Sequence, residues 1–255
     1  GAVEIAASTV ISGYIIGNPG AVSMGDGGQL NGRMLSTSGA VSLLNCKTFI
    51  SAIKSVLVPI NLESIANFSL YSASGAVSNV GISDITGDIG TNLGAINGFA
   101  TPSSANCSMQ NTNGITSQAA LDLLDIITQI ANTSTTTSTH APAFGNETLT
   151  PGVYAIAGAS SIAGVLTLDA KGDTGAQFIF KIGGAFAAAA GSSIILTNAA
   201  ISDNVYWIAV GAVALGAGST MLGTFIGYPG AVSALGGVAL EGRLCATAGA
   251  IAVDN

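Results

Sequence analysis

The sequence predicts a mainly β protein, a β-solenoid in which one short structural unit stacks on copies of itself. The tripeptide Gly-Ala-Val or Gly-Ala-Ile starts at positions 1, 20 and 39, at 75 and 94, and at 211, 230 and 249, so the step within each group is constant. A fixed period of about 20 residues is typical of such a repeat architecture. The chain also holds 35 Gly among 255 residues, 49% hydrophobic and only 7% charged residues, which indicates a packed β protein rather than a disordered chain.

A second, longer repeat predicts how the chain divides into domains. Residues 1–45 align without a gap with residues 211–255, so that Arg33 corresponds to Arg243 and Asn45 to Asn255. Residues 56–66 lack a Gly-Ala rung, and Pro59 interrupts the pattern there. We therefore expect residues 1–57 to be the terminal rungs of a preceding repeat plus the start of a connector, and residues 58–255 to be one complete solenoid domain.

One segment has helical rather than strand periodicity and predicts a side helix over residues 117–131. Thr116 is the expected N-cap, and Asp122 and Asp125 are expected to face solvent. The apolar residues that recur at helical spacing are Ala120, Leu123, Leu124, Ile127, Ile130 and Ala131. The Ser/Thr-rich stretch after this helix, which ends at His140, is expected to be a surface loop.

Charge and hydropathy exclude several classes of function. Six Lys and Arg residues and a net charge of −7 argue against a nucleic-acid partner, and no apolar run is long enough for membrane insertion. His140 is the only histidine and no nucleophile-elbow motif is present, so the chain is not expected to be an enzyme. Three cysteines allow a disulfide between Cys46 and Cys107, although Cys46, Cys107 and Cys245 could equally be small buried or loop residues.

Four sequence blocks resemble the microbial ice-binding, or antifreeze, protein family. The segment NFSLYSASGAVSNVGISDITGDIGTNLGAINGF from Asn67 resembles the opening of that domain, and blocks from Thr148, Asn204 and Leu240 follow in the family's order, together covering most of residues 62–255. The resemblance implies a right-handed, three-faced β-solenoid with one long α-helix along its side, no cofactor and a secreted, extracellular or cell-surface protein. It also implies that the first rung lies beside the last. The family's Thr-rich ice-binding pattern is reproduced here only in fragments, such as Thr86-Gly-Asp-Ile and Thr247-Ala-Gly-Ala.

Two functions follow from these patterns. The main hypothesis is a non-catalytic structural or adhesive module that binds copies of itself head to tail, because the rungs are poor in Thr and an open rung edge recruits other strands. The alternative is a protein that adsorbs to the surface of an ice crystal and restrains its growth or recrystallisation. The candidate ice-binding or assembly face comprises Ser74, Ala76, Ser78, Thr86, Thr91, Ala95, Ala231, Ser233, Thr247 and Ala250. The candidate assembly tail comprises Ala2, Ala21, Ser23, Ala40 and Ser42.

Overall fold

The structure is a computed structural model that describes residues 1–49, 57–99, 108–136 and 140–254. It contains two compact units, Gly1–Val56 and Leu57–Asn255, and each is considered by itself. No helix among the described residues is both long and apolar enough to cross a bilayer.

The first unit consists of three rungs of parallel strands that repeat at a constant step. Val3 pairs with Val22, which pairs with Val41, so that the Gly-Ala-Val tripeptides stack in register. Ile5, Met24 and Leu30 form its small core. One sheet contains β1 (Val3–Ile5), β3 (Val22–Met24) and β5 (Val41–Leu43), and the other contains β2 (Val10–Gly17), β4 (Gln29–Ser36) and β6 (Lys47–Phe49).

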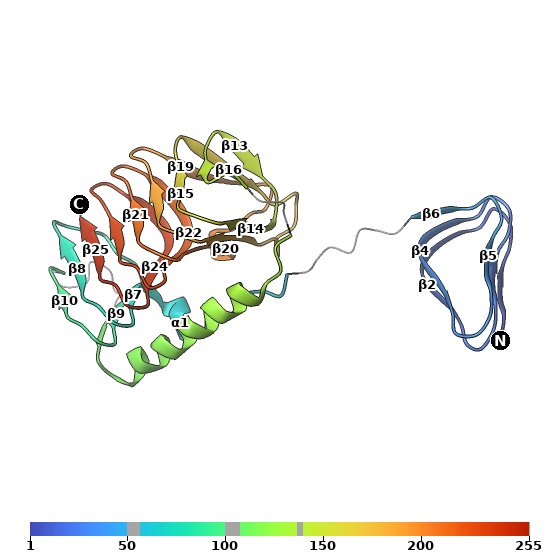
Figure 1. The fold of residues 1–255 in the computed structure, drawn as a ribbon, viewed down its shortest axis with the longest axis horizontal. Coiled ribbons are helices and arrows are strands. Elements are labelled where there is room, and N and C mark those ends of the chain that lie inside the picture. Colours follow the sequence, from blue (N-terminus) through green and yellow to red (C-terminus); the bar gives the residue numbers. More distant parts are fainter. Residues whose placement is uncertain (50–56, 100–107, 137–139, 255) are drawn as a thin grey trace. The chain divides into compact units, whose positions relative to one another are not determined.

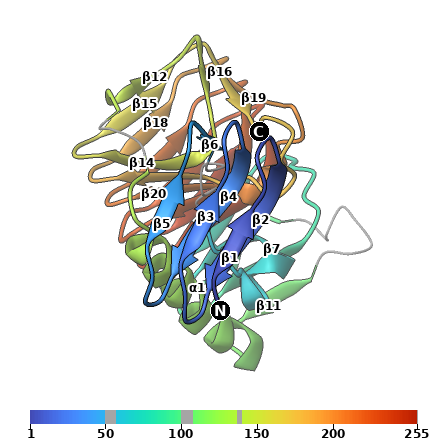
Figure 2. The same cartoon turned by 90° about the vertical axis from the view of Figure 1, so that its right-hand side faces the viewer.

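The second unit is a three-faced parallel β-solenoid, which confirms the predicted fold (Figure 1). One face is an eight-stranded sheet in the order β10-β8-β25-β23-β21-β18-β15-β12, and Figure 2 shows β12, β15 and β18 of this stack. Its strands are β8 (Val77–Val80), β10 (Ile96–Asn97), β12 (Ala143–Phe144), β15 (Ser160–Ile162), β18 (Phe186–Ala188), β21 (Val213–Leu215), β23 (Val232–Ala234) and β25 (Ile251–Asp254).

The other two faces share eleven strands, of which β22 shows how one strand bends around a corner. Thr220 of β22 pairs with β19 on one face, whereas Thr224 to Gly227 pair with β20 on the next. We call the face that contains β20 the helix-side face and the face that contains β19 the third face. Their strands are β7 (Phe68–Ser72), β9 (Asp88–Thr91), β11 (Met109–Asn111), β13 (Glu147–Leu149), β14 (Gly152–Ile156), β16 (Val165–Asp169), β17 (Phe178–Ile182), β19 (Ser193–Thr197), β20 (Val205–Ala209), β22 (Thr220–Gly227) and β24 (Ala239–Ala246).

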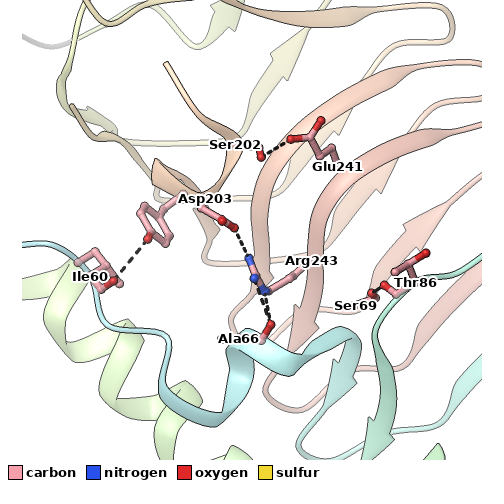
Figure 3. A network of polar contacts seen from close by, with 9 residues as sticks. Ile60, Ala66, Ser69, Thr86, Ser202, Asp203, Glu241 and Arg243 are labelled. Carbon is pink, nitrogen blue, oxygen red and sulfur yellow. Dashed lines mark hydrogen bonds and ion pairs between the residues drawn. The ribbon is translucent and has the colours of Figure 1, made fainter. Parts of the chain in front are cut away.

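The first rungs of this unit stack on its last rungs. Leu70 of β7 pairs with Leu244 of β24, and Val77 of β8 pairs with Ile251 of β25, so the C-terminal strand lies beside β8 (Figure 1). The short helix η1 (Glu63–Asn67) leads into β7, and Arg243 fixes it there. The Arg243 guanidinium donates to the Ala66 carbonyl at 3.1 Å and pairs with Asp203 of η2 (Ser202–Asn204) at 3.0 Å (Figure 3).

Stacked aromatic rings fill the solenoid interior. Trp207 is fully buried, and its ring lies parallel to Phe180 at 3.7 Å and to Phe225 at 5.7 Å between centroids. His140 stacks on Phe144 at 4.4 Å, and its Nε2 lies 3.1 Å from a Glu147 carboxylate oxygen. His140 lies outside regular secondary structure, as predicted, and its ring is only partly exposed because it packs against the aromatic core.

Helix α1 (Gly114–Asn132) runs along the helix-side face and begins three residues earlier than predicted (Figure 1). Its N-cap is Asn113, and Thr116 is the other half of a capping box: the Asn113 side chain accepts from the Thr116 N–H, and the Thr116 hydroxyl accepts from the Asn113 N–H. Leu123, Ile126 and Ile130 are fully buried in the cluster that α1 forms with the helix-side strands.

Asp122 of α1 is buried, although the sequence pattern placed it in solvent. Its carboxylate accepts hydrogen bonds from the Ser64 backbone and hydroxyl and from the Gln118 amide. Burial alone favours the neutral acid, but these donors outweigh that effect and lower the pKa of Asp122. The buried carboxylate thereby ties α1 to the segment that enters the solenoid.

Candidate functional site

The eight-stranded face presents small side chains at regular intervals. In a typical strand such as β23, Val232 and Ala234 point into the core while Ser233 points outward, as the period of two in a strand requires. The pairings across the sheet bring these outward residues together in one row. We call this row rank one, and it consists of Ala143, Ser161, Ala187, Ala214, Ser233, Ala252, Ser78 and Asn97.

A second row of small residues lies immediately before the strands. The Ala231 carbonyl accepts from the Val213 N–H at 2.9 Å, and the Ala250 carbonyl accepts from the Val232 N–H at 2.9 Å. The same bond recurs from rung to rung and aligns seven alanines, which we call rank two: Ala159, Ala185, Ala212, Ala231, Ala250, Ala76 and Ala95. Neighbouring strands lie about 4.8 Å apart and residues i and i+2 about 6.6 Å apart, so the two ranks form a nearly rectangular grid.

A column of glycines makes the corner beside rank two tight enough to stack. A methyl group on Gly230 would lie 1.9 Å from the Gly211 carbonyl oxygen, and one on Gly94 would lie 2.2 Å from that of Gly75. Any side chain at these positions would push successive rungs apart. The glycine column therefore fixes the spacing of the alanines that follow it.

The other two faces are less suited to contact with a flat, extended surface. Helix α1 covers the helix-side face. The third face carries larger side chains, because Ile195 and Val165 are exposed there and Glu241 adds a charge. On the eight-stranded face, Asp254 is displaced to the margin, opposite Val80.

The structure brings six of the ten predicted face residues onto this grid. Ala76, Ala95, Ala231 and Ala250 belong to rank two, and Ser78 and Ser233 belong to rank one. The other four do not: Ser74 and Thr247 lie in corner turns, Thr86 lies in the loop before β9, and Thr91 is buried.

Thr91 is 0% exposed, and its hydroxyl donates to the Gly75 carbonyl at 2.7 Å. It is therefore not a surface residue. It supplies a hydrogen-bond donor to a corner carbonyl inside the fold.

The sequence prediction missed the part of the grid on strands β15 and β18, and it omitted Ala212 although the Gly-Ala-Val at position 211 is one of the recognised repeats. Successive rank-two alanines there, Ala159, Ala185 and Ala212, are separated by longer steps than those of the Gly-Ala-Val groups. The tripeptide also changes, to Gly-Ala-Ser at Gly158 and Gly-Ala-Phe at Gly184. A search for Gly-Ala followed by any inward residue, with a variable step, would have found them.

The first unit carries the same two rows over three strands. The Ala21 and Ala40 carbonyls accept from Val3 and Val22 at 2.8 and 2.9 Å, which aligns them with Ala2. Ser23 and Ser42 pair in the outward row, but the third member is Glu4. The five candidate tail residues thus occupy positions equivalent to the grid of the second unit.

The remaining groups to place are possible metal ligands and the cysteines of the possible disulfide between Cys46 and Cys107. Among the described residues no group of three or more His, Cys, Asp or Glu side chains could hold a metal ion. The Cys46 sulfur lies 3.2 Å from the Gly25 carbonyl oxygen, and Cys107 lies outside the described residues. Burial raises the pKa of Cys245 to about 12, which keeps this thiol protonated.

Comparison with known proteins relates the chain to one family. The profile described as ice-binding-like matches residues 71–255. An ice-binding protein of Nostoc sp. (strain HG1) is 30% identical over 195 residues, covering 76% of this chain and 71% of that protein.

Two solved structures extend this similarity. An ice-binding protein of the Antarctic ascomycete Antarctomyces psychrotrophicus has a TM-score of 0.73 at 29% identity, covering 78% of this chain and 96% of that one. An ice-binding protein of an Antarctic Flavobacteriaceae bacterium has a TM-score of 0.73 at 32% identity, covering 99% of this chain and 68% of that one.

Proposed function

The chain belongs to the ice-binding-like family, and from this premise we propose that it adsorbs to ice through the eight-stranded face of its second unit. The observation that carries the proposal is the grid of ranks one and two, which lies on hydrogen-bonded parallel strands. Its members are all Ala or Ser except for Asn97, which lies on the edge strand β10. No charged side chain belongs to either rank.

Family membership also overturns the main hypothesis of a head-to-tail adhesive module. That hypothesis interpreted the Thr-poor Gly-Ala-Val rungs as a surface that packs against further copies. In the second unit the Gly-Ala-Val rungs instead contribute to one exposed grid, and the relatives named above are ice-binding proteins. The alternative hypothesis, ice binding, is the one that the comparisons support.

The grid suits ice because its geometry is regular and its side chains are short. Methyl groups order the water next to them, and interspersed hydroxyls can hydrogen-bond to that water. Each contact contributes little, but many contacts formed at once on a rigid sheet add up to stable adsorption. Because the strands are held by backbone hydrogen bonds, little conformational entropy is lost when the face binds.

The proposed role is non-catalytic and is carried out outside the cell, where the protein meets growing ice. Adsorption of a rigid face would pin the crystal front and restrain both growth and recrystallisation. The mechanism uses only this chain and the crystal surface, and needs no cofactor.

The test places one large side chain at the middle of the grid. Ala214 lies on β21, with Ala187 and Ser233 as its neighbours in rank one. A tyrosine ring there would hold several rungs away from a flat crystal surface. We expect Ala214→Tyr to lose most of the crystal shaping and thermal hysteresis of the wild type while keeping its circular dichroism spectrum.

The matched control is Thr167→Tyr on the third face, where Thr167 points outward between Thr148 and Ile195. This variant should shape ice as the wild type does. If Ala214→Tyr retains full activity, or if Thr167→Tyr loses it, the eight-stranded face is not the surface that contacts ice.

A further inference from the structure

A groove of about 350 Å³ lies between the C-terminal half of α1 and the helix-side face, along which this helix runs (Figure 1). Its floor is one row of outward side chains, because Ala155 pairs with Lys181 and Lys181 pairs with Ile208 across β14, β17 and β20. Ile127 and Ile130 of α1 form the opposite wall. The volume lies in the range of sites that hold small molecules.

The groove extends over four rungs. Its lining continues from Ala155 of β14 to Tyr228, which follows β22, and the four strands involved are successive neighbours in the sheet. Neighbouring strands lie about 4.8 Å apart, so the groove is about 14 Å long. Three bonds of an extended chain span at most about 3.6 Å, so an unbranched chain of about twelve carbons covers this length. The volume leads to the same number, because about twelve groups of about 30 Å³ each, the size of a water molecule in the liquid, fill it.

The charges at the groove favour a neutral ligand. Among the described lining residues only Lys181 and Tyr228 have polar side chains. The Lys181 ammonium group is already bound, since it donates to the carbonyl oxygens of Ala131, at 3.0 Å, and of Thr133 at the end of α1. Those carbonyls are the negative end of the helix dipole and would repel a carboxylate placed beside the ammonium group. An ionised head group would therefore lose its water without gaining a free partner of opposite charge.

Tyr228 supplies a polar group at one end of the groove. Its side chain is 40% exposed and follows the last of the four strands. A phenol hydroxyl both donates and accepts hydrogen bonds, so it can bind an alcohol. A neutral chain with one terminal hydroxyl can thus pair with Tyr228 while its methylene groups cover the row of Ala155, Lys181 and Ile208.

We propose that this groove binds one neutral, unbranched lipid chain of about twelve carbons that carries a terminal hydroxyl group. The chain lies along the stack against the stem of Lys181, and its hydroxyl group bonds to Tyr228. Burial of the methylene groups supplies the affinity, whereas the hydroxyl group sets the direction of the chain. The interaction uses the helix side of the second unit, so it does not depend on ice binding by the eight-stranded face.

The experiment measures how tritium-labelled 1-octanol, 1-decanol, 1-dodecanol and 1-hexadecanol bind to the full chain in equilibrium dialysis. Each added methylene group should strengthen binding by about fourfold as long as it fits in the groove, and the increase should end near 1-dodecanol. An increase that continues to 1-hexadecanol would show adsorption to an open apolar surface and would overturn the proposal, as would the absence of saturable one-to-one binding.

Dodecanoate, the ionised analogue, tests the choice of a neutral ligand. It should bind about tenfold more weakly than 1-dodecanol, because its carboxylate finds no free cation in the groove. Equal or tighter binding of dodecanoate would show that Lys181 selects an anion, and the proposal would be wrong.

Variants of the full chain locate the ligand. Ala131→Phe places a ring in the groove from an exposed position of α1 and should abolish binding. Its control, Leu121→Phe, adds a ring at an exposed position of the same helix outside the groove and should leave binding unchanged. Tyr228→Phe removes one hydroxyl group and should weaken the binding of 1-dodecanol by about fivefold.

Nuclear magnetic resonance of the isoleucine methyl groups gives a second readout that needs no substitution. With 1-dodecanol bound to the wild type, the methyl signals of Ile130 and Ile208 should shift. Unchanged signals from both residues would overturn the assignment to this groove, as would full binding by Ala131→Phe.

Discussion

The glycine column at the corner beside rank two gives a sharp test of how the grid is held. In Gly230→Ala, the new methyl group would lie 1.9 Å from the Gly211 oxygen and 2.3 Å from the Ala212 nitrogen, both rigid backbone atoms. The neighbouring rung must therefore shift by roughly 1 Å or more to restore van der Waals contact. Such overpacking costs about 2 kcal/mol.

A loss of about 2 kcal/mol lowers the melting temperature of a unit of this size by about 4–8 °C. Trp207 is the only tryptophan and lies buried in the second unit, so its fluorescence reports the unfolding of that unit alone. Ice shaping by Gly230→Ala should fall as well, because Ala231 in rank two follows this corner directly.

Gly158 provides the matched control within the same column. It precedes β15, the last strand but one of the sheet, and an added methyl group there meets nothing within 4 Å. Gly158→Ala should lower the melting temperature by less than about 2 °C or raise it slightly, because alanine reduces the entropy of the unfolded chain. If both substitutions lower the melting temperature equally, or if neither lowers it, the close approach of stacked rungs is not the reason that this corner requires glycine.

Two further predictions concern polar contacts. The Lys171 side chain, followed by the Asn198 amide, lowers the pKa of Asp169 from 3.8 to about 2. The resulting stabilisation is present above pH 3.8 and lost as the pH falls toward 2, so the melting temperature of Asp169→Asn should fall less steeply over this range than that of the wild type. A profile parallel to the wild type would contradict this. Arg243→Gln removes the bonds to Ala66 and Asp203 and should lower the free energy of unfolding, measured in urea, by about 2 kcal/mol. An unchanged urea midpoint would show that η1 packs in place without these bonds.

The fold was predictable because the sequence repeats with the same period as the stacked rungs. The inward Val or Ile of one constant-step rung pairs with that of the next, as Val213 does with Val232 and Val232 with Ile251. Periodicity also predicted four alanines of rank two, Ala76, Ala95, Ala231 and Ala250, but the prediction omitted Ala212 although it belongs to a group with a constant step. It failed on the rungs around Ala185, where more residues separate one rung from the next and the step changes.

Buried hydroxyls explain why part of the face was misplaced. Polarity places Thr91 at the surface, yet it pairs with Ser72 inside the corner, and each hydroxyl donates to a glycine carbonyl there. A buried carbonyl needs a hydrogen-bond donor. The polarity of a residue in the sequence does not show whether its hydroxyl donates to such a carbonyl or faces water. The N-cap was misassigned for a related reason, because Asn113 and Thr116 are both good capping residues and the box uses both.

The position of β8 between β25 and β10 has a consequence for how the protein folds during synthesis. Ser78 emerges from the ribosome early, but its neighbour Ala252 is made much later. Contacts so distant in sequence make folding slow. The early rungs therefore keep an unpaired strand edge until β25 has been synthesised and pairs with β8. The continuous face therefore cannot form progressively from one end, and exists only once the whole second unit has been released.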